Sequence, residues 1–288
     1  MFAKKKYLVY LFIGPTIFIL ILVMLYPLLY GFLMSFFRNR IITSQFVGLK
    51  NYIDLFSNYR FWDSVNISLK YTTASVLLHF FLGMLLALTL NRSTIFISIA
   101  RIIVLIPWMI AEPIVSIIWS WILDASYGFL NYILLKLGLI EMAISWIGDP
   151  SYALPASILV NVWRGFPFIG LLLLAGLQSI PETQYEAAIV DGANSWKLFC
   201  HITIPNLKHV MIVALTLDFI WTMRSMSLVY VLTRGGPADF TKIVPIKIYQ
   251  EGFEYINIGT AASMSVVLFL ILLIFTVIFI KVMKTENQ

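Results

Sequence analysis

The chain has 288 residues, of which 60% are hydrophobic and only 12% are charged, with a formal net charge of +6. A soluble domain of this composition would have too few polar residues to cover its surface, so a lipid bilayer must surround most of the chain. The single cysteine, Cys200, excludes a disulfide framework, and the three histidines lack the spacing of metal ligands, so no metal site is predicted.

Six apolar segments predict six transmembrane helices. The first follows Lys4, Lys5 and Lys6, and its apolar run is too long for a signal peptide, so it is interpreted as an uncleaved span. Each segment can cross a hydrocarbon core of about 30 Å. The six spans form a single transmembrane domain, 1–288, and are expected at about 7–37, 65–90, 97–123, 152–177, 207–232 and 258–283. A small surface helix is expected at 51–57.

The basic residues do not decide the orientation of these spans. Lysine and arginine are equally frequent on the two sides of the predicted topology, although the three lysines before the first span favour a cytoplasmic N-terminus. An even number of spans places both termini on the same side. Because the basic residues are scattered among apolar runs, membrane lipid is the expected partner and nucleic acid is not.

The interval between the fourth and fifth spans, residues 178–206, is polar but patterned as a helix. Pro181 suits a helix start, Glu182 and Glu186 place negative charge in the first turns, and Lys197 follows later, as the helix dipole favours. Gly192 interrupts this pattern. A short helix, a turn and a second short helix are therefore predicted.

Charged residues inside spans form a second signal, because each costs about 3 kcal/mol at mid-membrane unless it is paired or wetted. Arg164 lies near the middle of the fourth span, and Asp218 and Arg224 lie in the fifth. At about 100° per residue, Arg224 is about 120° from Asp218 and is expected to pair with a neighbouring subunit or span. Two faces of the fourth and fifth spans predict a shared cavity: Asn161, Arg164, Gly165 and Phe168, and Asp218, Trp221, Thr222 and Ser225.

The polar interval carries a resemblance to a known family. Glu186-Ala187-Ala188, three residues, Gly192, nine residues and Ile202-Thr203-Ile204-Pro205 resemble the EAA motif of the permease subunits of bacterial ABC importers. Ile204 replaces the usual leucine. The flanks QSIP, YEAA and DGA, together with LTRGGP at 232–237, resemble the sugar-importer branch, of the maltose and glycerol-phosphate type.

This resemblance implies an all-α, type I ABC importer permease fold with six transmembrane helices and cytoplasmic termini, in a bacterial or archaeal inner membrane. It implies a coupling helix from about Tyr185 to Ala193 that docks on a separate ATPase subunit. The implied coupling residues are Tyr185, Glu186, Ala187, Ala188, Asp191 and Gly192. The alternative is an amphipathic helix resting on lipid headgroups.

The implied partners are a second, homologous permease subunit in a heterodimer, two copies of a cytoplasmic ATP-binding subunit and an extracytoplasmic solute-binding protein. The chain has no G-x-x-x-x-G-K loop, so ATP and Mg²⁺ are expected on the partner ATPase and no cofactor on this chain. The expected function is that of a non-enzymatic permease for a sugar, expected to be an oligosaccharide.

The resemblance also implies a substrate pocket. The residues at the matching positions are Asn161, Arg164, Gly165, Asp218, Thr222 and Ser225, with Trp108 from the third span, and the helical face of the fifth span adds Trp221. Trp221 and Phe168 would contact a sugar ring, and the polar groups would bond its hydroxyls. Arg164 and Asp218 depart from the uncharged maltose-type pocket, which indicates a different or charged sugar. The alternative is that these groups only bond helix to helix.

Two residues outside the expected pocket and two rival functions stay open at this point. His79 is interpreted as a hydrogen-bonded packing residue, and Glu112, beside Pro113, as either a gate residue or a bonded structural acid. The leading rival is a secondary transporter driven by an ion gradient, which usually shows internal repeats and paired carboxylates. A more distant rival is an intramembrane enzyme, for which no nucleophile with its base is found.

Overall fold

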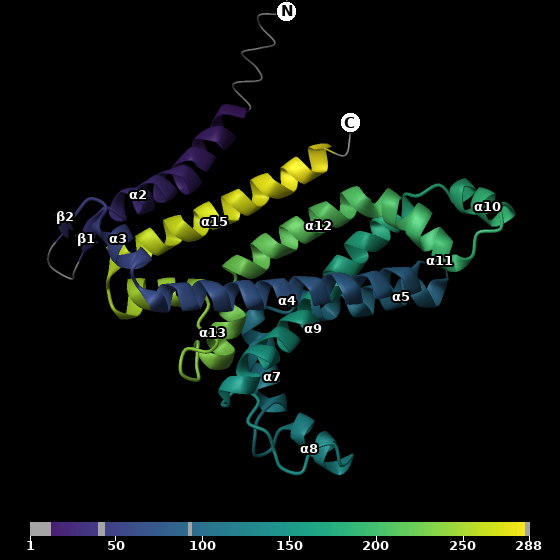
Figure 1. Cartoon of the computed structure of the whole chain (residues 1–288), viewed down its shortest axis with the longest axis horizontal. Coiled ribbons are helices and arrows are strands. Elements are labelled where there is room, and N and C mark those ends of the chain that lie inside the picture. The colour runs from purple at the N-terminus through teal and green to yellow at the C-terminus, as the bar shows by residue number, and fades with distance from the viewer. Residues whose placement is uncertain (1–12, 40–43, 92–93, 286–288) are drawn as a thin grey trace, which may run out of the picture. The chain divides into compact units, whose positions relative to one another are not determined.

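The computed structural model describes residues 13–39, 44–91 and 94–285 (Figure 1). The three N-terminal lysines and the start of the predicted first span lie outside these residues. The chain divides into two compact units, Met1–Trp62 with Lys247–Ile271, and Asp63–Ile246 with Leu272–Gln288. The helices and strands after the first helical stretch are η1 (Ile21–Leu25), α2 (Tyr26–Met34), β1 (Phe37–Asn39), β2 (Ser44–Phe46), α3 (Lys50–Phe56), α4 (Tyr59–Leu90), α5 (Ile95–Val104), α6 (Ile106–Met109), α7 (Glu112–Ile122), α8 (Phe129–Lys136), α9 (Pro150–Gln178), α10 (Glu182–Val190), α11 (Ser195–Leu198), η2 (Phe199–Thr203), α12 (Ile204–Arg224), α13 (Ser227–Thr233), α14 (Val244–Tyr249), η3 (Gln250–Glu254) and α15 (Ile258–Thr285).

The first unit contains a helix that is apolar on all sides, Ile13–Met34, followed by a small hairpin. Strands β1 and β2 pair antiparallel, with Phe37 opposite Phe46. The buried amide of Asn51 on α3 donates to the backbone oxygens of Ser35 at 2.8 Å and Phe37 at 2.9 Å. The surface helix expected at 51–57 is thus present as α3, and it is tied to a hairpin that the sequence did not predict.

Five helices among the described residues are long and apolar enough to cross a membrane, and a sixth span exists if one bent pair counts as one. The bent pair, Phe96–Met109 and Glu112–Ile122, turns by 91°. The all-α membrane fold expected from the sequence is therefore confirmed, and the third predicted span differs from a continuous helix. Ile110 and Ala111 are extended at the bend, where Pro113 supplies no backbone N–H to continue the helical ladder.

The fifth predicted span, 207–232, also differs from the structure. Its helix begins earlier, at Ser195, runs through η2 and ends at Arg224. Ser225 is extended (φ −72°, ψ 129°), and α13 begins at Ser227. The second short helix expected after Gly192 is therefore continuous with the fifth span. Pro205 is the second residue of α12 and directly follows the π-helical turn η2, where the α-helical hydrogen-bond pattern is already interrupted.

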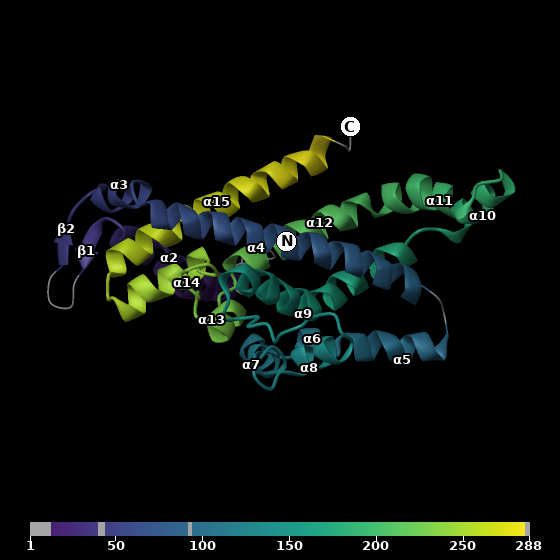
Figure 2. The same ribbon diagram turned by 60° about the horizontal axis from the view of Figure 1, so that its bottom comes forward.

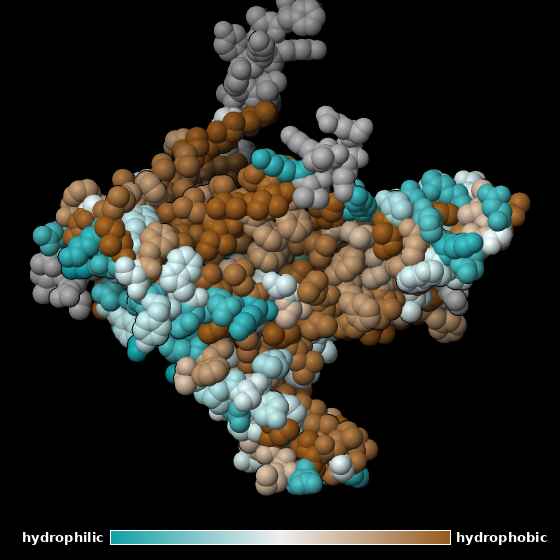
Figure 3. All heavy atoms as spheres, viewed as in Figure 1, coloured by the Kyte–Doolittle hydropathy of each residue, from teal (hydrophilic) through white to brown (hydrophobic). Residues whose placement is uncertain are grey.

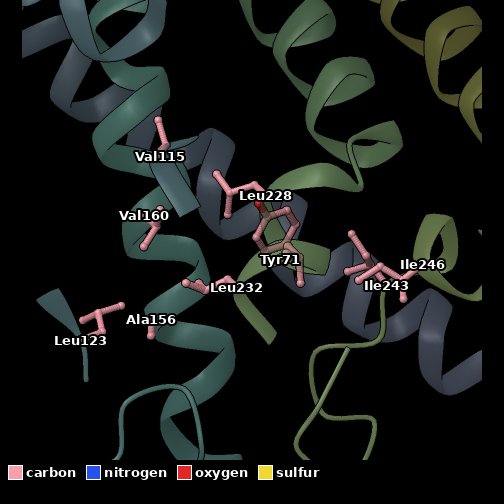
Figure 4. Close-up of a cluster of buried hydrophobic side chains, with 10 residues drawn as sticks. Tyr71, Val115, Leu123, Ala156, Val160, Leu228, Leu232, Ile243 and Ile246 are labelled. Atoms are coloured by element: carbon pink, nitrogen blue, oxygen red, sulfur yellow. The ribbon is translucent and has the colours of Figure 1, made fainter. Parts of the chain in front are cut away.

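Two apolar cores hold the second unit together. The first gathers around Tyr71 of α4, which points toward Leu228 of α13 (Figure 4). The second lies between α4, α9 and α12 and includes Leu173 and Leu207, both fully buried. A β-carbon on Gly83 would meet the backbone of Gly170 at 2.9 Å, so α4 and α9 cross with their backbones in contact.

The surface of the second unit changes character along its length. Hydrophobic side chains cover the visible face of α12, whereas hydrophilic ones gather around α10 (Figure 3). Figure 2 shows α10 and α11 beyond the end of α9, as Figure 1 does. Lipid can therefore cover the helices, and water or a protein partner can cover α10.

Candidate functional site

The two helix breaks and the middle of α9 border an open cavity of about 530 Å³. It is lined by Trp108, Glu112, Arg164, Trp221, Arg224, Ser225, Met226 and Ser227. Backbone that leaves the helical ladder inside a membrane is tolerated only where protein or water satisfies its polar groups. The breaks therefore coincide with the part of this unit where charged and polar side chains collect.

Glu112 connects the two breaks. One of its carboxylate oxygens lies 3.4 Å from Nη1 of Arg164, and the other accepts a hydrogen bond of 2.7 Å from Oγ of Ser225. Arg164 also donates from Nε to the backbone oxygen of Ile110 at 3.2 Å. Glu112 is thus a bonded acid, and its position as the first residue of α7 suits the positive end of that helix.

Arg224 differs from Arg164, although both line the cavity. It lies in the last turn of α12, is exposed, and has no ion-pair or hydrogen-bond partner within the described part of the chain. Of its two expected partners, a neighbouring span offers none among the described residues, and a neighbouring subunit stays a prediction. Its positive charge faces the cavity without a counterion.

A second polar group lies deeper, between α4, α9 and α12. Nδ1 of His79 lies 2.9 Å from Oδ2 of Asp218, and Nε2 lies 3.1 Å from the backbone oxygen of Asn161. Thr222 donates to the other oxygen of Asp218 at 3.4 Å. His79 is 2% and Asp218 is 7% exposed. His79 is therefore the hydrogen-bonded packing residue that the sequence indicated, and its partner was not foreseen.

The acceptors around His79 determine how many protons the pair carries. The carbonyl oxygen of Asn161 can only accept, so Nε2 must hold a proton. The contact between Nδ1 and the Asp218 carboxyl then needs one more proton, which resides on either partner. In both forms the pair has no net charge, which suits its burial in a membrane.

Aromatic rings lie beside the two polar groups and line the same small cavity. Trp108 stacks on Phe168 with ring centroids 4.5 Å apart, and Phe168 lies 5.7 Å from Trp221. Both tryptophans remain partly exposed to the cavity, Trp108 at 36% and Trp221 at 40%. Their indole faces can therefore pack against a flat apolar surface of a ligand.

The structure brings all eight predicted pocket residues together. They line either the large cavity or a small one of about 60 Å³ beside it. The amide nitrogen of Asn161 is buried there without a partner, and Gly165 leaves room for the imidazole of His79. Ser225 reaches the cavity from the break and not from the helical face that was predicted. Binding of a substrate by these residues stays a prediction.

Sequence reasoning left His79 and Glu112 out of the expected pocket. Both residues line the small cavity with the predicted set. The available signal was the presence of an ionisable side chain inside an apolar run, which in membranes marks a functional site by default. The same signal marks Arg164 and Asp218 in the sequence, but it does not show that Glu112 and His79 are their partners.

The predicted coupling segment forms α10 and a turn. The helix ends at Val190, so Asp191 and Gly192 lie in the turn and not in the helix expected at 185–193. Gly192 has φ +79°, a conformation that favours glycine. The segment is held to the fifth span by the hydroxyls of Tyr185 and Thr203, 3.0 Å apart, and by Asn206, which donates to Gln184 at 3.0 Å.

The six predicted coupling residues are accessible to a partner. None of the α10 residues is buried, and Glu186 has no partner among the residues that the structure describes. Ala187 is exposed and Ala188 half-buried, so small side chains lie beside the free carboxylate. No group of histidine, cysteine and acidic residues in the described ranges could hold a metal ion.

Comparisons with known proteins find relatives with similar sequences and solved structures with the same fold. The trehalose/maltose transport system permease protein MalF of Thermococcus litoralis is 37% identical over 97% of this chain and 96% of its own length. The sulfoquinovosyl glycerol transport system permease protein SmoG of Agrobacterium fabrum is 30% identical over 98% of this chain and 92% of its own. A bacterial ABC transporter for import of the acidic polysaccharide alginate has the same fold, with a TM-score of 0.85, 23% identity and coverage of 99% and 98%.

A second solved structure, a bacterial alginate ABC transporter in complex with an alginate pentasaccharide-bound periplasmic protein, aligns with a TM-score of 0.81 at 25% identity, covering 96% of this chain and 93% of its own. These similarities confirm the type I ABC importer permease fold and a multi-pass inner-membrane component that is not an enzyme. Residues 79–284 match the family described as binding-protein-dependent transport system inner membrane component. The chain belongs to this family.

Proposed function

We propose that the chain forms half of the translocation path of an ATP-driven saccharide importer. Its relatives are named for the transport of trehalose/maltose and of sulfoquinovosyl glycerol, and the similar solved complex holds an alginate pentasaccharide. A second, homologous permease subunit would complete the path, and an extracytoplasmic solute-binding protein would deliver the saccharide.

The observation that carries the coupling part of this proposal is the exposure of α10. Ile189 is 58% and Val190 87% exposed, although both are apolar, and the same helix exposes Glu182 and Glu186. A cleft in a separate ATPase subunit would cover this mixed surface, and small residues let two backbones approach closely. Two ATPase copies would bind ATP and Mg²⁺, no cofactor is proposed for this chain, and α10 and both termini would face the cytoplasm.

The cavity supports a saccharide as the cargo. Its volume of about 530 Å³ falls within the range of small-molecule sites. The indole faces of Trp108 and Trp221 offer apolar contact to sugar rings, and charged and hydroxyl groups beside them offer hydrogen bonds. The unpartnered amide of Asn161 adds a donor at the small cavity.

Charge reversal at Glu186 tests the coupling surface. Glu186→Lys is expected to abolish ATP-dependent saccharide uptake by membrane vesicles while the protein inserts normally, because the change removes an acid from an exposed docking face. Glu141→Lys, at an exposed acid in the segment between α8 and α9, is the matched control and should transport normally. Gly192→Pro should also abolish uptake, because proline cannot adopt φ +79°.

A second test collapses the proton gradient in the same vesicles and measures saccharide uptake with ATP present. Uptake that needs the gradient and not ATP would favour a secondary transporter and contradict the proposed function. Undiminished ATP-dependent uptake by Glu186→Lys would leave an ATP-driven importer but remove α10 as its coupling element.

A further inference from the structure

The charges that line the large cavity do not balance. Two guanidinium groups, Arg164 and Arg224, face one carboxylate, Glu112, so the formal charge of the lining is +1. Both oxygens of Glu112 are already engaged by Arg164 and Ser225. The nearby carboxyl of Asp218 is bonded to His79 and Thr222. No acid in the two groups is therefore left for Arg224.

The position of Arg224 makes this imbalance relevant to a ligand. The C-terminal end of α12 carries only about half a negative elementary charge, which is too little to neutralise the guanidinium of Arg224. The backbone leaves the helix at Ser225, directly after it. Because Arg224 is exposed, its guanidinium is accessible to an anion that enters the cavity. The planar guanidinium matches the geometry of carboxylate, sulfonate and phosphate groups.

We propose, building on the saccharide function above, that the cargo carries an oxyanion that Arg224 binds while its sugar ring contacts Trp108 or Trp221. Arg224 is then the residue that selects acidic over neutral saccharides. Arg164, which is held by Glu112 and by the backbone of Ile110, keeps its place at the opposite break. A neutral saccharide would leave the Arg224 charge without a counterion.

The test uses the full-length chain, co-purified with its partner subunits in lipid nanodiscs, and matched probes. The probes are neutral and acidic saccharides of one to three residues: glucose and galactose forms, their uronates, 6-sulfonates and 6-phosphates. Dissociation constants come from tryptophan fluorescence and calorimetry. The preferred acidic probe should bind about tenfold more tightly than its neutral match, as one charge-assisted hydrogen bond provides. Added salt should reduce this preference.

The Arg224→Gln variant should bind both members of a pair about equally, and Arg224→Lys should recover part of the preference. Lys136→Gln, which removes a charge from α8 outside the cavity, is the control and should keep the preference of the native chain. The three acidic arms identify which oxyanion is carried.

Several results would overturn the proposal without touching saccharide transport. Tight binding of a neutral probe with no acidic preference would do so, as would an unchanged preference in Arg224→Gln. Loss of the second permease subunit on purification of Arg224→Gln, with unchanged selectivity, would assign Arg224 to an acid of that subunit. Failure of every probe to bind or to be taken up would count against the saccharide function itself, and the proposal would fall with it.

Discussion

The two polar groups of the second unit contain similar residues in different surroundings. The inner pair, His79 with Asp218, joins α4 to α12, has 2% and 10% side-chain exposure, and uses both ring nitrogens. The outer pair, Arg164 with Glu112, has 21% and 25% side-chain exposure and opens on the large cavity with Arg224. A charged residue in a span therefore does not by itself mark a ligand site. Access and unused hydrogen-bonding capacity separate a binding group from a structural one.

The inner pair should show the largest effect on stability. Asp218→Leu leaves the Nδ1 side of His79 buried without its partner and is expected to lower the free energy of unfolding by about 3 kcal/mol. Denaturant unfolding in detergent micelles measures this change. The double variant His79→Leu with Asp218→Leu should lose less than the sum of the two single variants. Additive losses would show that the pair is not coupled.

Gly165→Ala should have the next largest effect. Its β-carbon would overlap the imidazole of His79, which packed neighbours hold in place, so a loss of about 2 kcal/mol is expected. Gly31→Ala, a helical glycine with nothing within 4 Å of the new methyl group, is the matched control and should be neutral or slightly stabilising. Equal melting temperatures for the two variants would contradict the close packing inferred at Gly165.

The outer pair should have the smallest effect on stability. Glu112→Gln keeps a hydrogen-bond acceptor for Ser225 and weakens a partly exposed ion pair, so a loss below about 1 kcal/mol is expected. The same change raises the formal charge of the cavity to +2 and should tighten binding of acidic probes. Unfolding and probe titration on one preparation separate these effects. A stability loss as large as that of Asp218→Leu would remove the distinction between the two pairs.

Much of the fold follows from the sequence because the bilayer demands long apolar helices. The helix breaks at Ile110–Ala111 and at Ser225 do not follow from the sequence. Pro113 is visible in the sequence, but prolines in membrane helices range from a slight kink to a break, and the surrounding packing decides the 91° turn. The break at Ser225 has no proline or glycine at that residue to announce it. The three-residue strands β1 and β2 are too short to show alternation.

The site was predictable as a set of residues and not as a set of bonds. Helical periodicity placed Asp218 and Thr222 on one face, and the structure joins them. The partner of Asp218 is 139 residues away in sequence, and only the packed bundle brings His79 to it. The ion pair between Arg164 and Glu112 likewise needs the bend after Ile110, which turns the first residue of α7 toward α9.

The hydrogen bond from Arg164 to Ile110 has a consequence for how the transporter can diverge. In a continuous helix the Ile110 carbonyl would accept from the amide of Ile114, which instead bonds to Ala111. The Arg164 side chain on α9 thus replaces a helical hydrogen bond that is missing between α6 and α7. Replacing Arg164 to suit a new cargo would also leave the Ile110 carbonyl without its hydrogen-bond donor. Replacing Arg224 would break no such hydrogen bond. Evolution can retune the cargo at position 224 more freely than at position 164.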